Sequence, residues 1–337
     1  MKIAKVSIII VNWNGGDVFK KCLQSIRKLK YQNYELIVVD NASTDGSYKY
    51  VDQSRGEMLI VNNGNLGFAP ANNIGYKRAK GKYVLLLNND TTVKSDLLNI
   101  LVNKMESDLN IGVIQPKIYL MDTNKKLDNC GSFLTRIGFL QHWGFFKKDS
   151  VEFSKEKIIF SAKGACMMTR KSIIDKVGLF DDTFGSYFEE TDYCWKVWLL
   201  GNKVLYFPNT FIYHKLAYSA KRMNPFSVNY HSFKNRISSL IKNLSFLNLL
   251  IILFMHLLVL NFLVVYYLFK FKLKEIVVIY KSIGWNILNI GEILKKRSIV
   301  QKFRKVDDDQ IFKYCMERIN VGSYLDSLTR LNKDFMN

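Results

Sequence analysis

The sequence predicts an α/β protein in which a mainly parallel sheet is flanked by helices, followed by a helical region at the C-terminal end. Two observations predict the sheet: short apolar runs recur through the first part of the chain, and segments with helical spacing separate them. A third observation predicts the helical region, because after about residue 232 the chain becomes strongly apolar and basic. With 337 residues and 48% apolar content, the chain can bury a large core.

Four strands and two helices are expected in the first part of the chain. Each apolar run has the length of a buried strand and ends in a polar or glycine-rich loop, as parallel strands do. Strands are expected at residues 6–11, 35–40, 58–61 and 83–87, and helices at residues 17–29 and 69–79. This alternation predicts βαβ units.

The middle of the chain has a looser pattern. Residues 115–187 are rich in aromatic residues and glycines, which suits a mixed-sheet wall beside a substrate site. Residues 192–200 have a broad apolar face, and Gly201 is expected to end that helix. A further strand is expected at residues 204–207, with Pro208 as its end.

The C-terminal third contains two long apolar segments. Residues 246–269 have no charged side chain, and a helix of this length would reach ~36 Å, enough to cross a bilayer. Residues 276–294 keep their apolar side chains on one face, as amphipathic helices do. Three interpretations of residues 246–269 stay open: a re-entrant or in-plane membrane element, one true span, or a soluble core helix. We divide the chain into a catalytic domain at residues 1–220 and a basic, membrane-associating region at residues 221–337.

The charge of the chain narrows the class of binding partner, and its cysteine content indicates the cellular compartment. The formal charge is +20, and residues 221–337 hold 19 Lys and Arg against 8 Asp and Glu. This excess favours phosphates or an acidic membrane surface. Because it surrounds an apolar segment and no nucleic-acid-binding motif accompanies it, nucleic acid is not expected as a partner. The five cysteines are widely spaced without a CxxC pair, which favours reduced thiols and a cytoplasmic setting.

Three polar features suggest chemistry. The strand at residues 83–87 ends in Asn88-Asn89-Asp90, and open α/β sheets bind ligands at the carboxyl ends of their strands. Oxygen donors at that edge suit Mg²⁺ or Mn²⁺ holding a phosphate. An acidic run at residues 189–192 could supply a general base, and His214 could complete a metal shell. The alternatives are that these acids only favour the positive end of a helix and that the histidine is structural.

Six motifs follow one another in the order and spacing of family 2 glycosyltransferases. They are VSIIIVNWNGG (6–16), VVDNASTDGS (38–47), NNGNLGFAPANNIG (62–75), VLLLNND (84–90), GACMMTRKSIIDKVGLFDDTF (164–184) and YFEETDYCWKVWLLG (187–201). Over about residues 1–220 the chain resembles this family, and within it the rhamnosyltransferase-like branch that builds cell-surface polysaccharides. The resemblance implies the GT-A nucleotide-diphospho-sugar transferase fold, a divalent metal, and transfer with inversion at the anomeric carbon.

The resemblance also implies a nucleotide site. Asp40 matches the family carboxylate that contacts the nucleotide base, although a turn-capping aspartate is the alternative. Asn72 matches a position that closes over the nucleotide, although a helix-interior or capping role is an alternative. The residues expected to bind the nucleotide sugar are Asn12, Asn14, Asp40, Gly67, Asn72 and Asn89.

The same resemblance assigns the metal ligands and the base. Asp90 matches the last aspartate of the Asp-x-Asp metal motif, whose first position is here Asn88, and His214 matches the histidine that completes the shell. Glu190 matches the second acid of the family's Glu-Asp motif, the general base that deprotonates the acceptor hydroxyl. Asp192 is the next catalytic candidate, binding the acceptor or holding the loop.

The sequence therefore predicts an inverting, metal-dependent hexosyltransferase. It would move a sugar, rhamnose by the branch resemblance, from a UDP- or dTDP-sugar to a lipid-linked or polysaccharide acceptor. It would act at the cytoplasmic face of the cell membrane, held peripherally, by a re-entrant element or by a single span. Two alternatives stay open. One is a sugar nucleotidyltransferase, although such an enzyme should carry a glycine-rich loop with Arg and Lys, and residues 12–16 contain neither. The other is a non-catalytic membrane-bound scaffold that binds nucleotide sugars.

Overall fold

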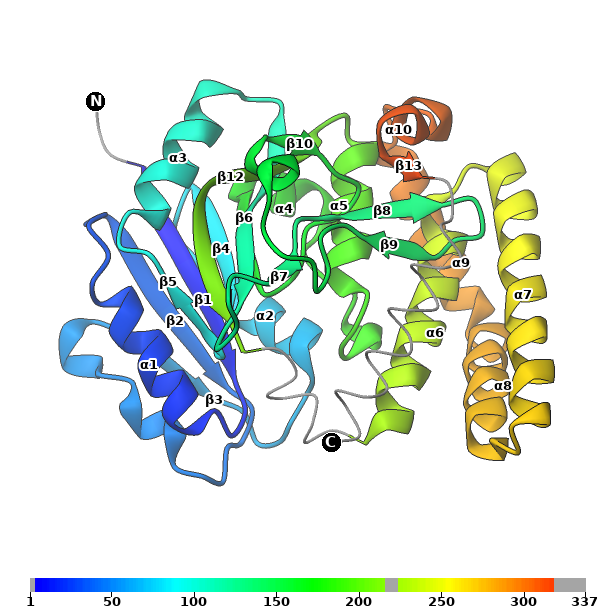
Figure 1. Cartoon of the computed structure of the whole chain (residues 1–337), viewed down its shortest axis with the longest axis horizontal. Coiled ribbons are helices and arrows are strands. Elements are labelled where there is room, and N and C mark those ends of the chain that lie inside the picture. Colours follow the sequence, from blue (N-terminus) through cyan, green and yellow to red (C-terminus); the bar gives the residue numbers. More distant parts are fainter. Residues whose placement is uncertain (1–3, 216–223, 318–337) are drawn as a thin grey trace.

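The computed structural model describes residues 4–215 and 224–317, and it places an α/β domain beside a group of helices (Figure 1). Side chains of the central strands alternate between two apolar cores. β1 (Val6–Asn12) sends Ile8 and Ile10 to one core and Ile9 to the other. One face of the sheet is covered by α1 (Gly16–Ile26) and α3 (Leu97–Ser107), and the other by α2 (Phe68–Tyr76), α4 (Lys171–Val177) and α5 (Glu189–Leu199).

The main sheet is mixed. Its strand order is β10-β12-β6-β11-β4-β1-β2-β3. Besides β1, this order contains β2 (Tyr34–Asp40), β3 (Met58–Val61), β4 (Tyr83–Asn88), β6 (Ile111–Leu120), β10 (Lys157–Ile158), β11 (Cys166–Arg170) and β12 (Lys203–His214).

The parallel half of this sheet follows the sequence prediction. β1 pairs in parallel with β2 and with β4, and β2 pairs in parallel with β3. β11, however, runs antiparallel between β4 and β6, so the sheet is mixed beyond β4, where β12 again pairs with β6 in parallel. The chain reaches β11 through hairpins and loops instead of a crossover helix, and a parallel connection would have required such a crossover.

Two predicted ends differ from the observed ones. α5 begins at Glu189 instead of residue 192, because the acidic residues form its first turn. β12 continues past Pro208 to His214, and irregular pairing with β6 between Phe207 and Phe211 accommodates the proline. The continuation carries His214 to β5 (Thr91–Val93), the short strand that follows the predicted metal motif.

Short hairpins form the wall expected between residues 115 and 187. β7 (Leu127–Asn129) pairs with β6. A second, three-stranded sheet contains β8 (Ser132–Thr135), β9 (Leu140–His142) and β13 (Met316–Glu317). The end of the described chain therefore returns to this wall.

The C-terminal part is helical, as predicted. Its helices are α6 (Pro225–Asn243), α7 (Phe246–Phe269), α8 (Leu273–Leu288), α9 (Ile290–Phe303) and α10 (Asp308–Cys315). α7 has the predicted bounds. The single amphipathic helix expected at residues 276–294 is instead divided at Asn289 between α8 and α9.

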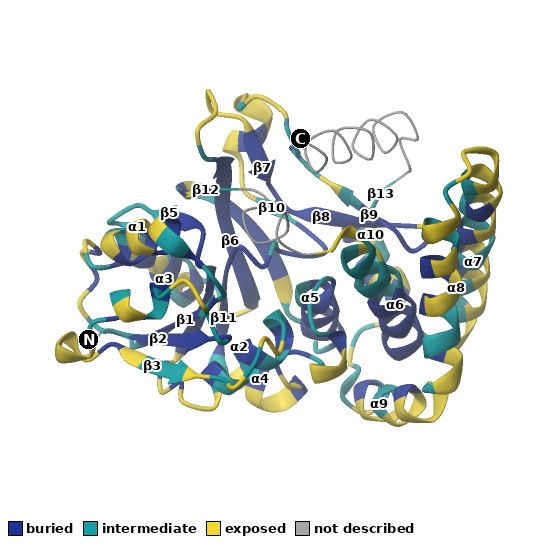
Figure 2. Cartoon of the chain, turned by 90° about the horizontal axis from the view of Figure 1, so that it is seen from below, coloured by how far each residue is buried: buried dark blue, intermediate teal, exposed yellow. Residues whose placement is uncertain are grey.

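α6 does not begin an independent unit. The second half of this helix is almost entirely buried, and its Leu240 shares one apolar core with Trp195 of α5. Figure 2 shows this burial as a dark α6 between the sheet and the exposed outer helices. A boundary at residue 220 therefore divides a continuous core.

Candidate active site

The carboxyl ends of β1, β2 and β4 meet in a hydrogen-bonded floor. Asn12 ends β1, and its Nδ2 donates to Oδ1 of Asp40 at the end of β2, at 2.7 Å. The Oδ1 atom of Asn12 accepts from Nδ2 of Asn89, which follows β4, at 2.9 Å. All three side chains are buried. Three residues of the predicted nucleotide site are thus brought together at one edge of the sheet.

Asp40 also caps the turn that follows β2. Its Oδ2 accepts from the backbone N–H of Ser43 at 2.8 Å, and its Oδ1 accepts from the Ser43 hydroxyl at 2.7 Å. These are the contacts of the turn-capping alternative. A direct contact between Asp40 and a nucleotide base stays a prediction.

Asn14 joins the loops that follow β1 and β2. Its φ is +49°, a left-handed conformation that asparagine tolerates better than most residues. Its Oδ1 accepts from the backbone N–H of Thr44 at 2.7 Å, and the N–H of Gly16 donates to Asp45 at 2.9 Å. The two loops therefore support one another beside the floor.

Gly67 brings the loop before α2 against the loop before α5. Its φ is +88°, and a Cβ at this position would lie 2.7 Å from the carbonyl oxygen of Gly185. That same carbonyl accepts from the N–H of Ala69 at 2.7 Å, so only glycine fits. Asn72 is buried in α2 and donates to the carbonyl of Phe68 at 2.9 Å, which is its helix-interior alternative. Nucleotide contacts by Gly67 and Asn72 stay predictions.

Asp90, His214 and Asp128 form a buried chain of carboxylate, imidazole and carboxylate. Pairing of β12 with β5 sets His214 opposite Thr91, next to Asp90. His214 Nε2 lies 3.1 Å from Asp90 Oδ1, and His214 Nδ1 donates to Asp128 Oδ2 at 2.8 Å. The other oxygen of Asp128 accepts from Lys163 Nζ at 2.6 Å. Sequence reasoning found the first two residues and missed Asp128 and Lys163, which lie in no periodic pattern or motif considered there.

The charges of Asp90, His214, Asp128 and Lys163 stabilise one another. Burial opposes a charge on His214, but the carboxylates of Asp90 and Asp128 outweigh it and raise the pKa of the imidazole to about 9. Burial pushes the pKa of Asp128 upward, yet Lys163 and His214 hold it well below its ordinary value. The chain therefore pairs each buried charge with an opposite one.

Asp90 and His214 are the residues that could hold a divalent ion. Asp90 Oδ1 is buried, and the nearest described cation to it is His214, whose Nε2 lies 3.1 Å away. Asp128 fixes the other nitrogen of His214 as a donor, so Nε2 could bind an ion in place of the proton that it holds toward Asp90. Within residues 4–215 and 224–317, no cluster of three or more His, Cys, Asp or Glu side chains could hold a metal alone. The two residues would therefore suit a Mg²⁺ or Mn²⁺ ion, for which a diphosphate and water would have to supply the further oxygen ligands.

The loop between β10 and β11 lies between the hydrogen-bonded group Asp90–His214–Asp128 and the acidic residues at the start of α5. Its Lys163 forms the ion pair described above, and its Ala165 accepts from the backbone N–H of Asn88 at 3.0 Å. A Cβ on Gly164, between these two residues, would lie 3.8 Å from the Cβ of Glu190. One short loop thus contacts the predicted metal side and the predicted base.

The first two residues of α5 have the properties of proton acceptors. Burial raises the pKa of Glu190, and burial together with the charge of Glu190 raises the pKa of Glu189 well above its ordinary value. No described residue donates a hydrogen bond to the Oε2 atom of either side chain. Tyr187 and Phe188, just before them, have φ values of +70° and +72°, the kind of backbone strain that clusters at active sites. A carboxylate with a raised pKa suits a general base.

Asp192 does not share these properties. It is 1% exposed, and both of its oxygens accept hydrogen bonds from α6. Oδ1 accepts from Asn243 Nδ2 at 2.8 Å and from the Ser239 hydroxyl, and Oδ2 accepts from Lys242 Nζ at 3.0 Å. Because both oxygens already accept hydrogen bonds, these contacts favour the alternative in which Asp192 holds the loop, and a catalytic role for Asp192 stays a prediction. In the structure, Asp192 attaches α5 to α6.

α6 also fixes the loop in front of the acids. Asn235 Nδ2 donates to the carbonyl oxygens of Phe184, Ser186 and Tyr187, at 2.6 to 3.0 Å. Sequence reasoning missed this helix as part of the site. A signal existed, since polar residues recur one and four positions apart along α6 and are all buried: Lys234, Asn235, Ser238, Ser239, Lys242 and Asn243.

Comparison with known proteins agrees with this geometry. Residues 7–178 match the family described as Glycosyl transferase family 2. The chain is 32% identical over 114 residues to glycosyltransferase GlyG of Streptococcus pneumoniae, which covers 32% of this chain and 38% of the relative. It is 23% identical over 206 residues to poly-beta-1,6-N-acetyl-D-glucosamine synthase of Staphylococcus aureus, which covers 60% of this chain and 48% of the relative. The chain thus spans less than half the length of each.

A solved structure shows a similar fold over most of the chain. The mannosyltransferase PcManGT from Pyrobaculum calidifontis, in complex with GDP-Man and Mn²⁺, gives a TM-score of 0.52 at 14% identity. The match covers 89% of this chain and 86% of that chain. At this identity the likeness shows the fold alone. The GT-A-like α/β architecture expected from the sequence is confirmed, with a sheet that is mixed.

Proposed function

We propose a function from the fact that this chain belongs to glycosyl transferase family 2: it is an inverting glycosyltransferase that uses a nucleoside diphosphate sugar. The loop between β10 and β11 carries the proposal, because its Lys163 pairs with Asp128, the hydrogen-bond partner of His214, and its Gly164 lies beside Glu190. We assign a UDP- or dTDP-sugar as donor and a lipid-linked or polysaccharide acceptor. Rhamnose is the sugar that the branch resemblance suggests.

The donor's diphosphate fits the sheet edge where β1, β2 and β4 end. Asp90 and His214 would hold a Mg²⁺ or Mn²⁺ ion, which when bound supplies positive charge against the departing diphosphate. The similar fold of PcManGT in complex with GDP-Man and Mn²⁺ supports a nucleotide sugar and a divalent ion here. Asn12 and Asn89 keep this edge rigid from beneath.

Glu190 acts as the base in this proposal. Its carboxylate takes the proton of the acceptor hydroxyl while the hydroxyl oxygen bonds to the anomeric carbon. The bond from that carbon to the diphosphate oxygen breaks on the opposite face, which inverts the configuration. The raised pKa of Glu190 makes it a stronger base than an ordinary carboxylate, and the ammonium of Lys163 opposes part of that rise.

A thermal-shift panel tests the donor site. UDP, dTDP, GDP and their sugars are compared with and without Mn²⁺. We expect stabilisation by a UDP or dTDP compound that requires Mn²⁺ and disappears in Asp90→Ala. Asp309→Ala, which removes an exposed aspartate on α10, is the matched control and should respond like the wild type. Undiminished Mn²⁺-dependent stabilisation of Asp90→Ala would rule out its role, and a response to GDP compounds alone would overturn the nucleotide assignment.

Product analysis separates the two alternative functions. A glycosyltransferase releases a nucleoside diphosphate from its donor, either to an acceptor or slowly to water. A sugar nucleotidyltransferase would instead release pyrophosphate from a nucleoside triphosphate. A non-catalytic scaffold would release neither while still binding the donor.

A further inference from the structure

The outer surface of α7 and α8 carries a concentration of exposed hydrophobic side chains. Of the 27 large hydrophobic side chains exposed in the described chain, 20 lie between residues 246 and 299. Phe254 and Phe262 of α7 are 64% and 66% exposed. Figure 2 shows this exposure along α7 and α8 at one edge of the molecule. Contiguous exposed apolar surface of this kind marks an interaction site.

The opposite face of α7 is bound to the catalytic domain. Its buried residues recur every four positions: Ile252, His256, Leu260 and Val264. In the middle of the helix, His256 Nδ1 donates to the carbonyl oxygen of Ile137 at 2.9 Å, and its ring lies 4.6 Å from that of Phe139. Ile137 and Phe139 belong to the turn between β8 and β9. The midpoint of α7 is therefore attached to the substrate-side wall.

This attachment decides how α7 can meet a membrane. If α7 crossed a bilayer, its midpoint would lie at the hydrocarbon centre and would take the β8–β9 turn with it. The backbone groups of a turn cannot be satisfied in lipid, so that arrangement is unfavourable. A helix that lies in the membrane plane meets no such conflict, because its exposed face enters the lipid while the bound face stays with the protein.

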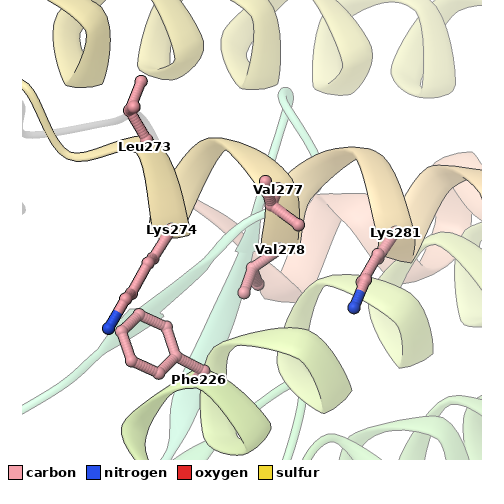
Figure 3. Close-up of a pocket in the computed structure, with 6 residues that line it drawn as sticks. All are labelled: Phe226, Leu273, Lys274, Val277, Val278 and Lys281. Carbon is pink, nitrogen blue, oxygen red and sulfur yellow. The ribbon is translucent and has the colours of Figure 1, made fainter.

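A basic groove lies at the start of α8, next to α6 (Figure 3). It has a volume of about 300 Å³, and its apolar lining residues are Phe226, Leu273, Val277 and Val278, of which Leu273 points away from Phe226. Lys274 and Lys281 lie along it, and the ammonium of Lys274 is 5.5 Å from the centre of the Phe226 ring. An apolar lining with two ammonium groups suits an acyl chain and the phosphate of its headgroup.

Charge identifies the partner as lipid. α7 has no charged residue over 24 positions, and the turn to α8 carries Lys270, Lys272 and Lys274. Glu275 is the one acidic residue of α7 and α8. An uncharged helix bordered by lysines matches the boundary between hydrocarbon and anionic headgroups.

We infer that the outward faces of α7 and α8, together with the groove at Phe226, bind in the plane of an anionic bilayer leaflet. The leaflet is the cytoplasmic one, which is rich in anionic lipid. α7 lies along the surface and does not cross it. This inference is independent of the reaction that the site performs.

Vesicle co-sedimentation of the full-length protein tests the surface. Phe254→Glu/Phe262→Glu should weaken binding to phosphatidylcholine–phosphatidylglycerol vesicles by about 100-fold, since each phenylalanine contributes about 1.5 kcal/mol and 1.4 kcal/mol is tenfold. Leu109→Glu changes a side chain that is 71% exposed far along the chain from α7, and as matched control it should bind normally. Unchanged binding of the double variant would overturn the inference.

The lysines are tested on the same vesicles. Lys274→Gln/Lys281→Gln should reduce binding to anionic vesicles about 30-fold, because each lysine near an anionic surface contributes about 1 kcal/mol. On pure phosphatidylcholine the variant should bind like the wild type. An equal loss on both lipids would overturn the role of the groove in recognising anionic lipid.

Cysteine labelling tests the orientation of α7 relative to the membrane. All five native cysteines in the described chain are free and buried, so a new exposed thiol can be labelled selectively. Phe246→Cys and Lys270→Cys mark the two ends of α7. In sealed vesicles with the catalytic domain outside, both should react with a membrane-impermeant maleimide. If only one end of α7 were protected, the helix would span the bilayer. If the protein formed a dimer without lipid and Phe254→Cys were protected from labelling in that dimer, the exposed face would bind a second copy of the chain. Either result overturns the inference.

Discussion

Replacing Asp192 by asparagine should destabilise the protein more than it alters the chemistry. The substitution keeps the side-chain volume but removes the charge beside Lys242. It also turns one accepting oxygen into a donating amide. Because Ser239 and Asn243 already donate to Asp192, the amide must face a donor on one side or the other.

The expected loss can be worked from these contacts. Removing one partner of a buried ion pair costs about 3–5 kcal/mol. Lys242 keeps a second carboxylate, Asp181, at 2.7 Å, so we expect a value at the lower end of that range. With an unfolding entropy of roughly 2.1 cal/mol/K per residue over 337 residues, a loss of about 3 kcal/mol lowers Tm by about 4 °C.

Calorimetry and turnover, measured on the same preparations, separate stability from chemistry. Asp192→Asn should lose about 4 °C in Tm and keep most of its rate well below the transition, by the entropy argument above. Glu190→Gln is the matched variant with the opposite pattern, a wild-type Tm and a large loss of rate. If Asp192→Asn instead had the wild-type Tm and lost the rate, Asp192 would be the base and the assignment of Glu190 would fall.

Three further predictions concern the site itself. Glu190→Gln should lower kcat by roughly 10²–10⁴-fold while calorimetric donor affinity is unchanged; a rise in KM alone would contradict the base role. Because burial raises the pKa of Glu190 and only its ionised form accepts a proton, the wild-type rate should fall as pH drops through that raised pKa, and the fall should be absent in the residual rate of Glu190→Gln; the same fall in that variant would assign the titration to another group. Asp128→Asn should weaken Mn²⁺ binding about 10–100-fold in a spectroscopic titration; wild-type affinity would show that Asp128 does not orient His214.

The parallel half of the fold could be predicted because its physics is local. β1, β4 and most of β2 are buried on both faces, so their apolar residues form continuous runs that end where the loops begin. Asn12, Asp40 and Asn89 follow such runs, and the shared direction of the strands brings them to one edge. Proximity of the predicted nucleotide residues therefore followed from strand direction alone.

The rest of the fold and of the candidate site could not be predicted, because it depends on contacts between segments that are far apart in the sequence. Asp128 lies in a three-residue strand that has no pattern of its own, and only its pairing with β6 brings it to His214. Pro208 suggested the end of a strand, but pairing with β6 carries β12 on to His214. The polar residues of α6 resemble a solvent-facing stripe until α5 and its acidic loop cover them. In each of these cases the conformation or burial of a segment is determined by the element that packs against it, and its own sequence does not show which element that is.

The attachment of Asp192 to Asn243 also sets an order of events during synthesis. The two residues are 51 positions apart in the chain. At about 5–20 residues per second, a ribosome needs about 3–10 s to pass from one to the other. Through that interval the nascent chain already contains the whole nucleotide edge, while the loop before Glu190 has no helix to hold it. A chain that ends after His214 and before Ser239 would keep the residues predicted to hold the donor and lack the helix that holds the predicted base, so such an unfinished molecule would be expected to leave a sugar donor intact.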